Sequence, residues 1–94
     1  MPYRHRNISG FLIRTRREEL GMTQEELAVK LQVAGLSNLD RGGVSKIEAG
    51  TRSVFDYELA VISEVLNSTP GAFLPDFDEV KASLANLVGK RIRN

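Results

Sequence analysis

Apolar residues recur at helical spacing along this chain, and no stretch of useful length shows the strict alternation of a strand. The clearest stretch is MTQEELAVKLQVAG, where Leu27, Ala28 and Leu31 form an apolar stripe. Thr23 and Glu26 fit a capping box, in which each side chain accepts a hydrogen bond from the other residue's backbone N–H. This pattern predicts a helix that begins just after Thr23.

Further helices are predicted on either side of that stretch. An earlier one runs from Asn7 or Ser9, either of which can cap it, to about Leu20, where a glycine stops it. A later one follows the letters DYELAVISEVLN, whose apolar residues are spaced i, i+3 and i+7. The short segment PGAFLP then places Phe73 and Leu74 against the core. The predicted domain is all-α.

The segment DRGGVSKIEAGTR predicts a short helix between the one that follows Thr23 and the one in DYELAVISEVLN. Asp40 is a good N-cap, Val44 and Ile47 fall on one face, and Gly50 can take the left-handed conformation that ends a helix. Such a helix is too short to be stable alone, so other helices must hold it. The side chains that point away from its apolar face are basic or polar: Arg41, Ser45 and Lys46.

The segment VAGLSNL, which precedes that helix, reads as a loop or a frayed helix end because of its glycine and polar pair. Two interpretations of its leucines compete. Leu36 and Leu39 either anchor the loop in the core or form a patch for a partner. Burial in the core is the favoured interpretation.

Residues 76–94 are predicted to form an appended amphipathic helix with a basic tail, ended by Gly89. The apolar stripe of this helix must be buried somewhere. It packs either on its own domain or on the same helix of a second copy, and the aliphatic stripe after a Pro75 break favours a dimer. The predicted dimer interface consists of Val80, Leu84, Leu87 and Val88.

Composition excludes several classes of protein. The 94 residues make one domain with a tail, without cysteine and without an apolar run long enough to cross a bilayer. We therefore expect a cytoplasmic protein with no membrane partner. A single histidine, His5, and the absence of clustered carboxylates argue against an enzyme, a metal site or a cofactor. Nothing in the chain implies a small-molecule ligand.

Charge is distributed unevenly, although the net charge is only +1. Residues 1–17 contain five arginines and no acid, and residues 89–94 contain three further cations and no acid. Basic ends suit a polyanion such as DNA, although a solvated terminus is an equally good interpretation. We assign residues 1–8 to a basic N-terminal arm and residues 9–75 to the helical domain.

Three stretches together carry a family resemblance: IRTRREELGMTQEELAVKL, then VSKIEAGTR, then YELAVISEVLNSTPGAFL. They resemble the XRE-type helix-turn-helix family, similar to the lambdoid phage repressors, over about residues 10–74. The resemblance implies five helices, the second and third forming the helix-turn-helix, with a further helix appended here at the C-terminus. It also implies sequence-specific binding of double-stranded DNA.

Carried over by position, the resemblance implies roles for individual residues. Thr23 and Gln24 lie at a helix N-terminus that would face a phosphate. Thr51 and Arg52 fall where relatives grip the phosphate backbone. A structural ion pair is implied between Arg17 and Glu48. The residues at base-contacting positions are Arg41, Gly42, Gly43, Ser45 and Lys46.

Two departures from the family pattern affect these assignments. The loop before the third helix is longer than in most relatives; such a loop can still present the helix, but it leaves the docking angle open. Gly42 and Gly43 replace side chains that often read bases, and glycine disfavours a helix interior. DRGG is therefore either a turn before a later helix start, or a helical segment whose backbone approaches DNA closely.

The sequence predicts a transcriptional regulator, a homodimer that reads an inverted repeat through residues 41–49. The alternative is an antitoxin-like interaction module that binds a protein partner through the C-terminal segment.

Overall fold

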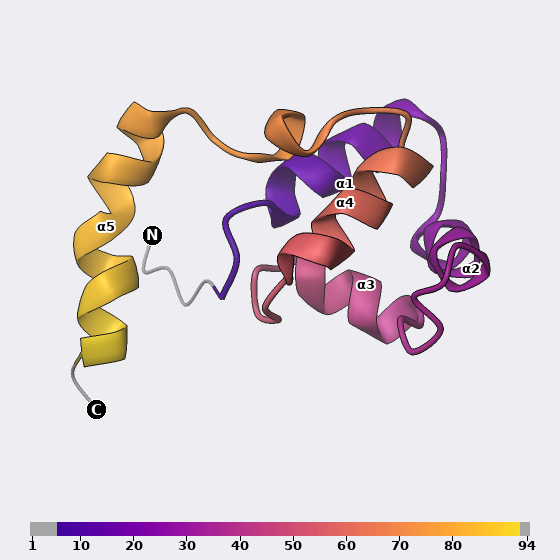
Figure 1. Cartoon of the computed structure of the whole chain (residues 1–94), viewed down its shortest axis with the longest axis horizontal. Helices are drawn as coiled ribbons and strands as arrows, with labels where there is room; N and C mark the ends of the chain where they lie inside the picture. Colours follow the sequence, from indigo (N-terminus) through magenta and orange to yellow (C-terminus); the bar gives the residue numbers. More distant parts are fainter. Residues whose placement is uncertain (1–5, 93–94) are drawn as a thin grey trace.

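A computed structural model describes the backbone of residues 6–92 and side chains as far as Val88. Over this range the chain is helical and contains no strand, which confirms the all-α prediction. None of the described helices is both long and apolar enough to cross a membrane. The elements, shown in Figure 1, are α1 (Gly10–Glu19), α2 (Gln24–Val33), α3 (Arg41–Glu48), α4 (Asp56–Val65), the 3-10 helix η1 (Pro70–Phe73) and α5 (Phe77–Ile92).

A single apolar core lies among α1 to α4 and η1. Helix α3 packs against both α1 and α2, and η1 closes against α1 and α4. Leu36 and Leu39 are buried in this core, so their interpretation as loop anchors is confirmed. Phe73 is buried as predicted, but Leu74 is 49% exposed, because η1 ends at Phe73 and the chain continues extended. The expectation that Leu74 packs in the core was wrong.

The first two helices begin at side-chain caps. At α2 the predicted capping box is present, with Glu26 N donating to Thr23 Oγ1 at 3.0 Å and Thr23 N donating to Glu26 Oε1 at 2.8 Å. At α1, Ser9 occupies the N-cap position without a side-chain cap bond. Asn7 caps the helix instead, because its Oδ1 accepts hydrogen bonds from Ser9 N at 3.0 Å and Gly10 N at 2.7 Å.

Helix α3 begins at Arg41, so both glycines lie inside it and the alternative of a DRGG turn was wrong. Asp40 caps it by accepting from Gly43 N at 2.8 Å. A Cβ at Gly43 would lie 2.8 Å from a methyl of Leu39, so a larger residue here would have to displace that side chain. Gly50, with φ of +79°, ends the helix as predicted.

Helix α5 stands apart from the other helices, beyond an extended connection (Figure 1). Asp76 caps it by accepting from Glu79 N at 2.9 Å. The helix continues through Gly89 to Ile92, so the predicted stop at Gly89 was wrong. Glycine lowers helix propensity by about 1 kcal/mol, which does not by itself end a helix.

The structure describes the predicted N-terminal arm only from residue 6 onward. Residues 1–5, including Arg4 and His5, lie outside the described residues. Arg6 donates its backbone N–H to Gly50 O at 2.7 Å, and Asn7 bonds to the domain through its side chain. The segment 6–8 is therefore attached to the end of α3.

Gly10 marks the closest approach of α1 to α3. A Cβ at this position would overlap the carbonyl oxygen of Ile47 and lie 3.0 Å from that of Glu48. Both obstacles are backbone atoms, so relief requires the two helices to move apart. We expect Gly10→Ala to lower the free energy of unfolding by about 1–3 kcal/mol, as overpacking does. Urea unfolding measures this loss.

Gly71→Ala is the matched control, since a Cβ at Gly71 meets nothing within 4 Å. Equal stability of the two variants would contradict the close approach.

Candidate nucleic-acid interface

The structure brings Arg17 of α1 and Glu48 of α3 together as a buried ion pair. Arg17 Nε donates to Glu48 Oε2 at 2.6 Å and Arg17 Nη2 donates to Glu48 Oε1 at 3.0 Å. The side chains are 9% and 3% exposed, respectively. The hydrogen bonds to Glu48 raise the pKa of Arg17, so the guanidinium stays charged. Two charges removed from water need this kind of bidentate geometry to be tolerated.

Helix α2 joins the same network at its first turn. Arg17 Nη1 donates to Met22 O at 2.6 Å, and Gln24 Nε2 donates to Glu48 Oε1 at 3.0 Å. Among the described residues, no buried side-chain nitrogen or oxygen lacks a hydrogen-bond partner. The start of α2 and the last residue of α3 are therefore fixed to α1 through one carboxylate. Gln24, expected at a phosphate, uses its side chain inside the protein.

The face of α3 that points away from the other helices is exposed to solvent. Val44 and Ile47 are each 1% exposed and belong to the core. Gly43 is half-buried beneath Leu39. The structure places the remaining predicted base-contacting residues on the solvent side of the helix, where all are exposed: Arg41, Gly42, Ser45 and Lys46. Thr23, at the start of α2, is exposed as well.

Arg52, also expected at a phosphate, forms a second ion pair. Its Nη1 and Nη2 donate to Glu58 Oε1 at 3.1 Å and Oε2 at 3.0 Å, and Nη1 also donates to Ser53 O at 2.9 Å. The Arg52 side chain is 25% exposed, whereas that of Glu58 is 4% exposed. The guanidinium is thus held in one orientation at the surface.

Glu58 also contributes to the start of α4, because Phe55 N donates to its Oε1 at 3.0 Å. Burial alone would raise the pKa of Glu58, but hydrogen bonds from Arg52 and from the Phe55 backbone outweigh it, so the pKa lies below its ordinary value. The hydrogen bonds to Glu58 likewise raise the pKa of Arg52. Both groups are therefore charged at neutral pH.

A shallow depression of about 620 Å³ opens beside α3 and the connection that follows it. Thr51 lines it, with its Oγ1 donating to Lys46 O at 3.3 Å. The other lining residues come from the N-terminal segment, α3 and the connection after it: Arg6, Asp40, Gly42, Gly43, Lys46, Arg52 and Ser53. Three cations and one carboxylate thus surround it, which suits an anion.

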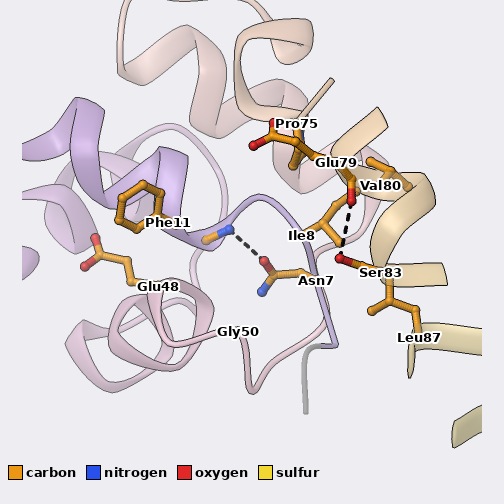
Figure 2. A pocket seen from close by; sticks show the side chains of 11 residues that line it. Asn7, Ile8, Phe11, Glu48, Gly50, Pro75, Glu79, Val80, Ser83 and Leu87 are labelled. Atoms are coloured by element: carbon orange, nitrogen blue, oxygen red, sulfur yellow. Dashed lines mark hydrogen bonds between the residues drawn. The ribbon is translucent and has the colours of Figure 1, made fainter. Parts of the chain in front are cut away.

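The predicted dimer residues divide between two surfaces. Val80 and Leu87 are half-buried and line a cleft of about 230 Å³, whose opposite wall includes Ile8 and Phe11. Figure 2 shows α5 on one side of this cleft and the segment carrying Asn7 and Ile8 on the other. Leu84 and Val88 are 40% and 45% exposed. The stripe therefore faces its own domain at two positions and is open to solvent at the other two.

The sequence assigned Asn7 only a capping role and gave no role to Gly10 or Glu58. In the structure Asn7 joins distant segments, Gly10 lies at a helix crossing and Glu58 pairs with Arg52. The only local signal was an Asn ahead of a predicted helix. The described residues contain no group of three or more His, Cys, Asp or Glu that could hold a metal ion.

Comparison with known proteins gave one match. The family model described as helix-turn-helix matches residues 13–73, which cover α1 from Ile13 onward and all of α2, α3, α4 and η1. No curated protein and no solved structure matches the chain.

The pair at Glu48 gives a direct test of how α3 is held. Glu48→Ala leaves the buried Arg17 guanidinium without its counterion, so we expect a loss of about 3–5 kcal/mol in the free energy of unfolding. Urea denaturation followed by circular dichroism measures it. Glu19→Ala is the control, because Glu19 is 59% exposed and its pair with Arg16 lies at the surface. A loss at Glu48 no larger than that at Glu19 would contradict the assignment.

Proposed function

This chain belongs to the XRE-type helix-turn-helix family, and from that premise we propose that it is a homodimeric transcriptional regulator that reads an inverted repeat through α3. The family is one of DNA-binding regulators, so double-stranded DNA is its partner. The observation that carries the finer proposal is the split character of α3. Its inner face is fixed by Val44, Ile47 and Glu48, and its outer face presents exposed basic and polar groups.

Base readout on this proposal rests on Arg41, Ser45 and Lys46. Arg and Lys pair with guanine O6 and N7 in the major groove, and Ser is compatible with several bases. Gly42 lacks a side chain and is exposed, so it lets the backbone of α3 come close to the base edges. The buried bonds at Glu48 support this reading, since a rigid helix keeps its side chains in register with the groove.

Phosphate contacts on this proposal flank α3 on two sides. The backbone N–H groups at the start of α2 attract an anion, and Thr23 lies there at an exposed position. Because the Gln24 side chain is bonded to Glu48, we assign the Gln24 contact to its backbone N–H. Thr51 and Arg52 supply the second flank, with Arg52 oriented by Glu58.

The proposed dimer uses the exposed part of α5. Phe77, Leu84 and Val88 are 72%, 40% and 45% exposed, which is a large apolar content for one helix face. Val80 and Leu87 lie beside them at the cleft and complete the stripe. Helix-turn-helix dimers bind half-sites about 34 Å apart, one helical turn of DNA, so a two-fold pairing of α5 must hold the two copies of α3 at that spacing.

The same exposed residues support a second candidate. An antitoxin-like module would bury Leu84 and Val88 against a different protein instead of a second copy. The two candidates differ in what the purified chain does alone. Only the first requires self-association.

Selection from random duplex pools at two salt concentrations tests base readout. We expect a palindromic motif that loses information at defined positions in Arg41→Ala and in Lys46→Ala, because each bidentate contact contributes about 1–3 kcal/mol of discrimination. Lys30→Ala removes an exposed lysine from α2 and serves as the control. An unchanged motif in both α3 variants, or only sequence-blind binding, would refute readout by α3.

Analytical ultracentrifugation tests the dimer. We expect Leu84→Asp to dissociate it, because an aspartate would be buried without a partner. Ala82→Asp adds the same charge two residues earlier, at an exposed position on the opposite side of the helix, and should leave the dimer intact. A wild-type chain that is monomeric at high concentration would favour the protein-partner candidate.

A further inference from the structure

The carboxamide of Asn7 joins three segments that are distant in sequence. Its Nδ2 donates to Ile47 O at 3.1 Å, at the end of α3, and to Arg52 O at 2.8 Å, in the connection to α4. Its Oδ1 accepts from the N–H groups of Ser9 and Gly10 at the start of α1. Figure 2 shows the side chain between these elements, with the bond to the start of α1 drawn as a dashed line. All four hydrogen-bonding positions of the amide are therefore used.

Arg6 directly precedes Asn7 and is held in place by a backbone hydrogen bond. Its N–H donates to Gly50 O at 2.7 Å, immediately after α3, so the chain of Arg6 follows the end of that helix. The Arg6 residue is exposed and lines the depression beside α3, together with Lys46, Thr51 and Arg52. A residue from the N-terminal segment thus shares one surface with residues 40 positions and more along the chain.

The charges around this depression are not equivalent. Glu58 compensates the charge of Arg52, and Asp40 directs its carboxylate to Gly43 N as a cap. Lys46 and Arg6 are exposed cations on the same rim, one from α3 and one from the N-terminal segment. The surface therefore combines the oriented guanidinium of Arg52 with the exposed cation of Arg6 within one concave site, an arrangement suited to a phosphodiester.

We propose that Arg6 is a further DNA-contacting residue, held by Asn7 at one phosphate site with Thr51 and Arg52. This assignment rests on the proposed function, since it names an additional contact to the same DNA. Asn7 is the positioning residue: its bonds to Ile47 O and Arg52 O keep the N-terminal segment, the end of α3 and the Arg52 connection in a fixed relation.

The salt dependence of binding to a random-sequence duplex tests the contact without knowledge of the operator. Each neutralised phosphate contributes about 0.9 to the slope of log K against log salt concentration. We expect Arg6→Gln to lower that slope by about 0.9 relative to the wild-type chain. Arg14→Gln removes the same charge from an exposed position on α1, paired with Glu18, and should leave the slope unchanged.

The role of Asn7 is tested by a double-mutant cycle. We expect Asn7→Ala to lower the salt slope by about the same amount as Arg6→Gln, and the double variant to lower it no further, because one contact is lost in all three. A purely structural role for Asn7 would lower stability and leave the slope unchanged. Circular dichroism at the assay temperature verifies that each variant is folded, and the Arg6→Gln result stands if Asn7→Ala is not.

The possible outcomes separate this inference from the proposed function. A wild-type chain that binds no duplex at low salt overturns both. Wild-type binding with equal slopes for Arg6→Gln and Arg14→Gln overturns only the Arg6 contact. A slope lowered by Arg6→Gln but by neither Arg14→Gln nor Asn7→Ala retains the contact and overturns the positioning role of Asn7.

Discussion

The position of α3 depends on a buried carboxylate. An eight-residue helix has too few internal hydrogen bonds to be stable alone, so its orientation must come from what it packs against. Glu48 accepts from Arg17 of α1 and from Gln24 of α2, which fixes the last residue of α3 to both neighbouring helices. Because a buried charge is tolerated only when its partners are in place, this network disfavours other dockings of the helix.

The two ends of α3 are held in different ways, and each leaves the outer face free. At its start, Asp40 caps the backbone, and Leu39 packs over Gly43 from the core side. At its end, Gly10 allows α1 to come close to the carbonyl oxygens of Ile47 and Glu48. Asn7 donates a hydrogen bond to the carbonyl oxygen of Ile47. None of these contacts uses Arg41, Ser45 or Lys46. Holding the helix and presenting its basic face are thus functions of different residues.

Helix α5 is less tightly joined to the other helices than α3 is. It carries its own cap at Asp76 and lies across a cleft from the start of α1. Val80 and Leu87 turn toward that cleft, while Leu84 and Val88 remain open to solvent. An amphipathic helix that is only partly covered retains apolar surface for a further contact. Within the part of the chain that the structure describes, α1 to α4 and η1 therefore form the compact unit, and α5 provides the surface suited to assembly.

The sequence by itself determined the elements whose causes are local. The Thr23–Glu26 box, the Asp40 cap and the Gly50 stop each act within a few residues, and the apolar stripes around them placed Leu27, Val44 and Ile47 in the core. The Arg17–Glu48 pair was implied by the family resemblance, and a glutamate on the inner side of an apolar helix needs such a partner. The tertiary structure alone decided that Asn7 reaches Ile47 and Arg52, that Arg52 is bonded to Glu58, and that the α5 stripe is divided. Contacts between segments tens of residues apart leave no periodic signal, because they arise only when separately formed helices meet.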